Sequence, residues 1–532
     1  MPIVASSLSP YLSRKRLVRK PAVCSTSGIV VSQNRAASEV GARVLKAGGH
    51  AVDAAVATAF ALGVVEPWMS GIGGVGAALV RDAKSGKVTA FDFGGRSPKG
   101  LKVSDFKLKP GADGDLFGWP VVDGNINTVG AKAVVAPTEP AGLALLHKTF
   151  GRARWGDLVM PAVALAREGL AVDWHTTLII ATAFADLARD KGAAARFLPN
   201  GAPPVSPAAT DPTPGKRLDL KALATTLTVL ADKGALALYD GPMAKAIADD
   251  VRALGGYLTM DDLAAVAPAT VMPLEIPYRD RTIHVLPELN GGPTLDMAFR
   301  HLAAHRGPIG AAPDAPAFSA YAHALRHAWA WRFAHMGDAG ERTAPTSTTH
   351  MAVIDRDGNV VTLTQTLLSL FGSRIVLPQS GILMNNGINW FDPRPGGPNA
   401  ITPDRRVLAN YVPAIMTGGD RVIGLGGCGG RKIIPAVFQL LAMSAEYGMD
   451  LDTVFHAPRI DVSGVDRIAV DRRLDAAIFD ALARDFAVVP AEPLVYTNPF
   501  TIASAVARTG TTNEGAAEPE QPWAEAVGED EV

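Results

Sequence analysis

The sequence has almost no cysteine and almost no net charge. Cys24 and Cys428 are the two cysteines among 532 residues; they lie too far apart to indicate a disulfide framework, and neither belongs to a metal-type cluster. We expect both to be small buried residues. The 51 basic and 52 acidic side chains leave a net charge of −1, which argues against nucleic acid as the main partner.

Long apolar runs are also missing. The most apolar stretch, Ala51 to Val65, is too short to span a membrane and contains Asp53. The first twenty residues carry five basic side chains, but neither an apolar core nor a small-residue cleavage site follows them, so a secretory signal is not supported. We therefore expect a soluble, cytoplasmic protein without a membrane partner.

Signals for a cofactor or a metal ion are weak. The glycine loop from Ser70 to Gly76 has no strand directly before it and no helix start after it, so a backbone turn is favoured over a nucleotide site. The histidines form two i,i+4 pairs, His301 with His305 and His323 with His327, but no His-Glu-x-x-His motif is present. We expect surface or core histidines, no metal and no cofactor.

The most informative stretch runs from Ser347 to Thr366. Apolar residues recur at every second position on either side of Asp-Arg-Asp-Gly-Asn, which predicts two strands joined by a tight turn. If the turn is centred on Asp357, residues whose numbers sum to 714 face each other, so Thr348 lies opposite Thr366. A cross-strand pair of threonines can be purely structural, contributing a few tenths of a kcal/mol.

The same stretch resembles the processing site of the gamma-glutamyltranspeptidase family. The matching residues are Ser347-Thr348-Thr349-His350, an apolar strand, Asp-x-x-Gly-Asn and a second strand bearing Thr366. Members of that family are N-terminal nucleophile hydrolases that cut themselves before a threonine. The resemblance implies cleavage between Ser347 and Thr348, Thr348 as the nucleophile, and Thr366 as the residue that orients its hydroxyl.

Chemistry explains why a chain terminus is useful there. A threonine hydroxyl is a poor nucleophile at neutral pH, whereas a free α-amino group has a reference pKa of about 7.7–8.0 and can accept its proton. Cleavage would therefore create the base that the mature nucleophile needs. In the precursor, the hydroxyl of Thr348 would attack the carbonyl of Ser347.

A second glycine turn supplies the remaining catalytic feature. The apolar residues from Val422 lead into Gly426-Gly427-Cys428-Gly429-Gly430-Arg431, and such a turn can present backbone N–H groups to a developing oxyanion. The resemblance assigns that role to Gly429 and Gly430. A P-loop is excluded, because no Gly-Lys-Ser/Thr follows.

The resemblance extends from about Ser27 to Ala505 and implies a domain organisation. We expect an N-terminal arm (1–26), a large fragment (27–347), a small fragment carrying the nucleophile (348–510), and a disordered tail (511–532) with seven acidic and no basic side chains. The segment 336–347 is expected to be a linker. The implied fold is the family's α+β four-layer αββα sandwich, whereas patterning alone predicts only a mixed α/β protein.

The match weakens at the residues that would choose the substrate. The family arginine four residues before a proline is replaced by Gly94, with Arg96 nearest, and the acidic residues after the Asn385-Asn386 pair are absent. The serine pair of the family is replaced by Ala409-Asn410, and an asparagine beyond the second threonine by Leu368. Losing a charged partner for an ammonium group costs several kcal/mol. The candidate substrate-binding residues are Arg96, Asn386, Asn389, Asn410 and Arg431, of which Arg96 or Arg431 could hold a carboxylate.

Two classes of function follow from these observations. The first is a self-processing amide hydrolase or acyltransferase that acts on γ-glutamyl compounds or, as some family members do, on small amides such as oxamate. The second is an uncleaved, non-catalytic member that acts as a binding protein. For the enzyme, the implied partners are a small-molecule substrate and the chain's own two fragments, paired as a heterodimer that could itself dimerise.

Overall fold

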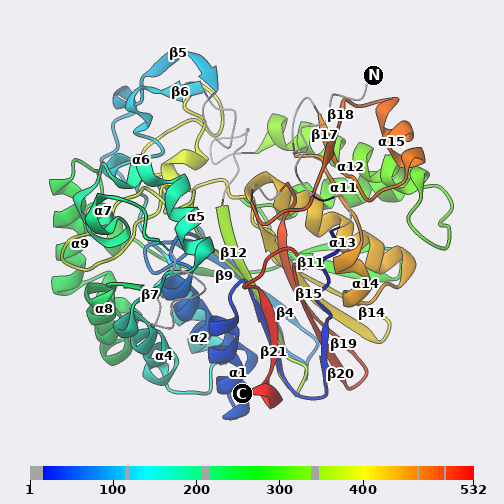
Figure 1. Cartoon of the computed structure of the whole chain (residues 1–532), viewed down its shortest axis with the longest axis horizontal. Helices are drawn as coiled ribbons and strands as arrows, with labels where there is room; N and C mark the ends of the chain where they lie inside the picture. The colour runs from blue at the N-terminus through cyan, green and yellow to red at the C-terminus, as the bar shows by residue number, and fades with distance from the viewer. Residues whose placement is uncertain are drawn as a thin grey trace.

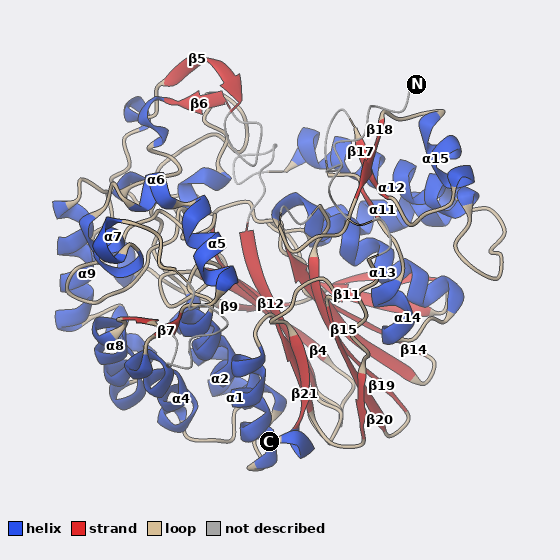
Figure 2. Ribbon diagram, in the orientation of Figure 1, coloured by secondary structure: helices blue, strands red, loops and turns tan. Residues whose placement is uncertain are grey.

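Two stacked β-sheets form the centre of the molecule and helices cover both outer faces (Figure 1, Figure 2). The structure is a computed structural model that describes residues 13, 16–113, 120–205, 216–336, 347–463, 467–496 and 499–532. The expected linker, 336–347, lies almost entirely outside the described residues.

Each sheet has seven strands, and all neighbouring strands are antiparallel. The first has the order β21 (Glu525–Gly528), β2 (Ile29–Ser32), β12 (Ser347–Ile354), β13 (Val360–Leu368), β3 (Val75–Arg81), β4 (Val88–Phe93) and β9 (Ala269–Val271). The second has the order β1 (Val23–Ser25), β20 (Thr512–Ala517), β19 (Ile502–Thr509), β15 (Arg421–Cys428), β14 (Ala414–Gly418), β11 (Arg281–Val285) and β10 (Leu274–Tyr278).

The helices divide between the two outer faces. Those associated with the first sheet are α1 (Arg35–Lys46), α2 (Ala51–Val65), α3 (Glu139–Phe150), α4 (Trp155–Glu168), α5 (Trp174–Thr182), α6 (Phe184–Leu187), α7 (Lys191–Phe197), α8 (Lys221–Lys233), α9 (Gly241–Ala253) and α10 (Met260–Ala264). Those on the second are α11 (Gly292–His305), α12 (Ala315–His335), α13 (Ile433–Tyr447), α14 (Leu451–His456) and α15 (Ala476–Ala483). Short strands complete the described structure: β5 (Leu108–Asp113), β6 (Pro120–Val122), β7 (Leu170–Ala171), β8 (Arg217–Leu218), β16 (Ile460–Asp461), β17 (Ile468–Asp471) and β18 (Val488–Ala491).

Side-chain alternation along the strands builds three apolar layers. On β12, Met351 and Val353 pack toward α2, whereas Ala352 and Ile354 pack between the sheets. The alanine-rich α2 fits into the interior, and its first turn is closed by a capping box between His50 and Asp53. These layers confirm the four-layer αββα sandwich. Within the described residues, no helix is both long and apolar enough to cross a bilayer.

Glycine allows the two sheets to approach closely at their middle strands. A Cβ on Gly426 of β15 would lie 2.3 Å from the ring of His350 on β12. A Cβ on Gly424 would lie 2.6 Å from Val360 and 2.9 Å from Thr362, both on β13. Such distances are below van der Waals contact, so a larger residue at either position would force the sheets apart.

The prediction of a disordered C-terminal tail is wrong, because residues 512–528 provide strands to both sheets. β20 pairs with β1 and β19, and β21 pairs with β2. The acidic side chains meet cations from distant segments, in the pairs Glu514–Arg421 (3.1 Å), Glu518–Arg459 (2.8 Å), Glu525–Arg35 (2.7 Å) and Glu529–Arg356 (3.0 Å). Local charge therefore misled the prediction, since the compensating arginines are far away in the sequence.

The predicted boundary of the N-terminal arm, residues 1–26, also needs correction. Its residues Val23–Ser25 form β1, an edge strand of the second sheet, so the folded structure begins before residue 27. Cys24 on this strand is exposed, contrary to expectation, whereas Cys428 is buried as expected. The exposure follows from the position of β1 at the edge of its sheet.

Candidate active site

The hairpin of β12 and β13 has the predicted register up to Thr349. Thr349 faces Gln365 and Met351 faces Leu363, but Ser347 faces Leu368, so the register shifts by one residue between Ser347 and Thr349. The shift places two residues, Thr366 and Leu367, opposite the single residue Thr348, which is a β-bulge. Both Thr348 and Thr366 are fully buried in this uncut chain.

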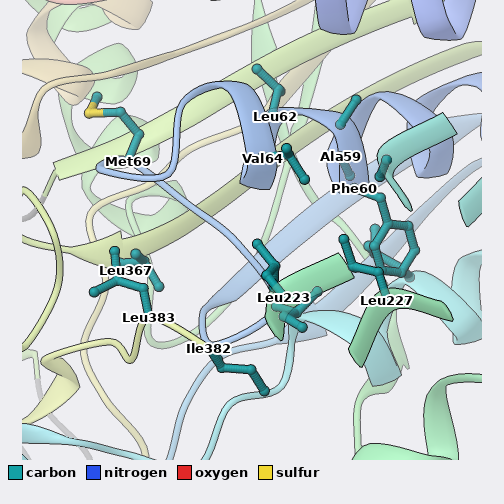
Figure 3. Packing of buried hydrophobic residues seen from close by; sticks show 14 of the residues in the cluster. Ala59, Phe60, Leu62, Val64, Met69, Leu223, Leu227, Leu367, Ile382 and Leu383 are labelled. Atoms are coloured by element: carbon teal, nitrogen blue, oxygen red, sulfur yellow. The ribbon is translucent and has the colours of Figure 1, made fainter. Parts of the chain in front are cut away.

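Both threonines belong to the face of the hairpin that looks toward the second sheet. Thr366 pairs across strands with Val75, which packs in the inter-sheet core. Two residues after Thr348, the His350 ring packs against Gly426 of the second sheet and lies 2.8 Å, Nδ1 to Oγ1, from Thr364. The intervening residues point to the helices, and Leu367 packs beside Leu383 in the apolar cluster under α2 (Figure 3).

The glycine turn after β15 lies at the same end of the sheets. Because Gly424 meets Thr362 and Gly426 meets His350, β15 runs toward the end of the hairpin that carries Thr348 and Thr366. Its last residue, Cys428, is followed by Gly429 at φ +132° and Gly430 at φ +70°. Both values fall in the region that favours glycine, so this turn requires residues without a side chain. The four residues predicted to be catalytic thus lie at the same end of the two sheets.

The backbone is strained at the last residue of β13, two residues after Thr366. Leu368 has φ +85° with a fully buried side chain, and its N–H donates a 2.7 Å hydrogen bond to Oγ1 of Thr366. A bulky residue at positive φ costs of order 1–3 kcal/mol and persists only where its surroundings impose it. The hydrogen bond occupies one acceptor position of the Thr366 hydroxyl and so restricts how this group can turn.

Asn386 and Asn389, predicted to contact substrate, are used within the protein. The Nδ2 of Asn386 donates to Thr128 O (3.0 Å) and Ser369 Oγ (2.9 Å), and its Oδ1 accepts from Ser369 N (3.0 Å). This amide therefore fixes the turn that follows β13. Asn389 is fully buried, and its Oδ1 accepts a 3.1 Å hydrogen bond from Nδ2 of Asn127.

The two candidate arginines occupy different environments. Arg96 is half exposed, pairs with Asp404 at 3.2 Å and lines a cavity of about 290 Å³ together with Asp92 and Arg406. Arg431 directly follows the glycine turn, and its guanidinium lies 5.1 Å from the ring centroid of Phe333. Burial lowers the pKa of Arg431 to about 10.

Gly94, which stands where the family has an arginine, lies close to the loop that carries Asn410. A Cβ on Gly94 would lie 3.2 Å from Asp92 Oδ1 and 3.3 Å from the hydroxyl of Tyr411. Gly94 follows β4, two strands away from Thr366 in the same sheet, and so about 10 Å from it. A side chain at Gly94 would therefore contact Tyr411 tightly, although Gly94 also lines the cavity that Arg96 lines.

Two buried residues of the site were not found from the sequence. Glu66, at the end of α2, accepts a 3.2 Å hydrogen bond from Oγ1 of Thr349, and burial raises its pKa to about 8. It also lines a cavity of about 370 Å³ with Trp68, His175 and Trp523.

The second missed residue is Arg332 of α12, which donates a 2.6 Å hydrogen bond to Oδ1 of Asn410. No local sequence signal marks Glu66 or Arg332, because their partners are distant in the chain. Within the residues that the structure describes, no group of three or more His, Cys, Asp or Glu side chains is arranged to hold a metal ion.

Comparison with known proteins finds relatives along most of the chain. The gamma-glutamyltranspeptidase family model matches residues 37–346 and 327–527. The glutathione hydrolase proenzyme of Bacillus subtilis (strain 168) is 30% identical over 492 residues, 81% of this chain and 80% of that protein. The acylase ACY 1 proenzyme of Pseudomonas sp. (strain V22) is 32% identical over 482 residues, 84% of each.

Among solved structures, the cephalosporin acylase of Bacillus halodurans superimposes with a TM-score of 0.82 at 24% identity, covering 99% of both chains. This likeness shows that the chain has the same fold as that acylase over its whole length. Together with the match of the family model over nearly the whole sequence, it leads to one conclusion: the chain belongs to the gamma-glutamyltranspeptidase family.

Proposed function

We propose that this protein is a self-processing amide hydrolase or acyltransferase that uses Thr348 as its N-terminal nucleophile. The observation that supports the proposal is the meeting of Thr348, Thr366 and the Gly429-Gly430 turn at one end of the two sheets. These residues provide a hydroxyl, a group to orient it and backbone donors for an oxyanion, which are the parts that amide cleavage needs.

Processing would begin with attack of the Thr348 hydroxyl on the carbonyl carbon of Ser347. The bond from that carbon to the Thr348 nitrogen breaks, an ester to the hydroxyl forms, and the proton of the hydroxyl passes to the leaving amine. Water then hydrolyses the ester, so that Thr348 becomes a chain terminus. Backbone N–H groups at Gly429 and Gly430 would stabilise the negative charge on the carbonyl oxygen.

The mature enzyme would repeat this chemistry on a substrate. The α-amino group of Thr348 takes the proton of its own hydroxyl, the hydroxyl attacks the substrate amide, and the amine product leaves from an acyl-enzyme. Water or a second amine then accepts the acyl group. Thr366, whose hydroxyl already accepts a hydrogen bond from Leu368, would orient the nucleophile.

We further infer that the acyl group differs from γ-glutamyl. Gly94 provides no guanidinium for a carboxylate, and residues 387–390, which follow the Asn385-Asn386 pair, contain no acidic side chain. An ammonium group bound there would lack a charged partner, which costs several kcal/mol when it is buried. Relatives named acylase and relatives named glutathione hydrolase match this chain at similar identity, 32% and 30%.

The first prediction is cleavage of the purified chain before Thr348. The wild type should give two fragments by intact mass, the second beginning with Thr348, whereas Thr348→Ala should remain full length. Thr349→Ala is the matched control, because the Thr349 hydroxyl points to Glu66 on the other face, and this variant should still be cut. A wild-type chain that stays whole would favour a non-catalytic binding protein instead.

The second prediction concerns Thr366. Thr366→Val keeps the shape and removes the hydroxyl, so processing or turnover should slow by about tenfold or more through lost orientation. Thr362→Val makes the same change on the same strand, at a buried hydroxyl with no hydrogen-bond partner among the described residues, and should leave the rate unchanged. If Thr366→Val is processed and turns over as fast as Thr362→Val, the Thr366 hydroxyl has only a structural role.

The third prediction concerns the substrate. In a panel of glutathione, γ-glutamyl-p-nitroanilide, oxamate and other short carboxylate amides, kcat/KM should be higher for the short amides that lack an ammonium group. The reason is that no carboxylate replaces the family's acidic residues after Asn386. Efficient turnover of γ-glutamyl-p-nitroanilide would contradict an altered acyl pocket.

The fourth prediction concerns the carboxyl group beside the processing junction. Because the pKa of Glu66 is raised to about 8, the protonated form stabilises the folded state fully below pH 4.5, and this stabilisation is lost as pH rises toward 8. Glu66→Gln keeps an acceptor for Thr349 but does not titrate. The free energy of unfolding of the variant, relative to that of the parent, should therefore increase with pH by up to about 1.4 kcal/mol per pH unit between pH 4.5 and 8.

Urea unfolding of both chains in the uncut Thr348→Ala background, from pH 5 to 9, measures this difference. The control is Glu168→Gln on α4, where the side chain is 58% exposed and faces Arg217 at 3.5 Å; because an arginine does not titrate between pH 5 and 9, the difference that this substitution makes should not vary with pH. A pH-independent difference for Glu66→Gln would mean that Glu66 is ionised throughout.

A further inference from the structure

The cavity of about 370 Å³ that Glu66 lines is not part of the acyl site described above. Asn34, which follows β2, and Trp523, which precedes β21, both line it, so it lies on the flank of β12 away from β13, β3 and Gly94. Its lining residues include none of the four residues proposed to be catalytic. Its volume falls within the range of small-molecule sites, which is about 300–1,000 Å³.

Three aromatic side chains line this cavity and contact one another. The His175 ring stacks on the Trp523 ring with their centroids 4.1 Å apart, and it lies edge to face with Trp68 at 5.7 Å. Burial lowers the pKa of His175 to about 4, so this ring carries no charge at neutral pH. Tryptophan rings can stack with an aromatic ligand and attract a positive charge to their faces.

Glu66 supplies a buried carboxyl group to the same cavity. The residue is 2% exposed, and the recorded hydrogen bond of its carboxyl comes from Thr349 and uses Oε2. Among the described residues, no cation forms an ion pair with this carboxyl, and burial raises its pKa to about 8. A buried carboxylate that lacks a counter-ion is stabilised by a cation that binds beside it.

The other charged groups of the cavity do not supply that cation. Arg217 pairs with Glu168 at 3.5 Å, and Asp173 caps the start of α5. Cys428, a buried neighbour of Glu66, has a thiol whose pKa is raised by burial and by that carboxyl, so it is also uncharged. The lining thus holds three carboxyl groups and one guanidinium, which leaves an excess of negative charge whenever Glu66 is ionised.

We propose that this cavity is a second small-molecule site, which binds arylalkyl ammonium ions. The ammonium group pairs with Glu66, and the aromatic body stacks against Trp523 and Trp68. The ligand lies on the α2 side of β12, where the Thr349 hydroxyl points, whereas Thr348 belongs to the opposite face. The inference goes beyond the proposed function and does not depend on it.

Calorimetry on the uncut full chain carrying Thr348→Ala tests the site with two probes of similar shape, phenethylamine and phenethyl alcohol. At pH 7 the amine is a cation, and it should bind at least tenfold more tightly than the neutral alcohol. Glu66→Gln keeps an acceptor for Thr349 and removes the charge, so it should weaken binding of the amine at least tenfold. Trp523→Ala removes the stacking surface and should weaken it at least fivefold.

Glu139→Gln is the matched control. Glu139 is another fully buried carboxyl, at the start of α3, and its pKa is also raised by burial, but it does not line this cavity. This variant should bind phenethylamine as tightly as the parent does.

Proton release is a second measurement, which needs no variant of Glu66. The free carboxyl is mostly protonated at pH 7, because its pKa is about 8, whereas a bound cation favours the carboxylate. Binding should therefore release close to one proton per amine, measured from the binding heats in buffers of different ionisation enthalpy. The affinity for the amine should rise by up to about tenfold per pH unit between pH 6 and 7.

Three results would each overturn the inference: an amine that binds no more tightly than the alcohol, binding without proton release, or binding that neither Glu66→Gln nor Trp523→Ala weakens. Because every measurement uses the uncut chain, failure of the proposed function leaves this test intact. A wild type that does not cut itself before Thr348 would count against the proposed function alone.

Discussion

The close contact between the sheets at Gly424 and Gly426 is the constraint on which the rest of the site depends. Without side chains at these positions, β15 can lie directly over Thr362 and His350 of the hairpin. Its glycine turn is thereby carried to the end of β12 and β13 where Thr348 and Thr366 meet. The absence of side chains at Gly424 and Gly426, in the middle of the sandwich, thus determines the position of the glycine turn at its end.

The proposed site separates a part proposed to be catalytic from a part proposed to select the acyl group. Thr348, Thr366, Gly429 and Gly430 lie on strands or in the turn directly after one, and backbone pairing holds them in place. The selecting part sits on loops, at Gly94, Asn386 and Asn410–Tyr411, and is held by side chains. Loop residues can change without disturbing the sheets, which is why one scaffold can serve different acyl groups.

What could be predicted from the sequence depends on how local each interaction is. The hairpin, its register up to Thr349 and the glycine turn follow from alternation and turn chemistry within about twenty residues, and the sandwich followed from the family resemblance. The bulge at Thr348 was not predicted, because it depends on how the strand end meets the loops around it. Asn386 fixes a turn instead of facing outward, since its partners Thr128 and Ser369 come from other segments. The hydrogen bonds of Arg332 and the ordered C-terminal strands likewise depend on partners far away in the chain.

The two strands of the C-terminal segment have a consequence for how the protein is made. β20 and β21 come late in the sequence, yet one belongs to each sheet, where they pair with β1 and β2 from its early part. Neither sheet can have its full set of strands until residues 512–528 have left the ribosome. Any reaction that requires the completed sandwich must therefore wait for these residues to emerge. By then both sheets contain strands from before and after the Ser347–Thr348 bond, so a cut there would leave the two fragments paired with each other.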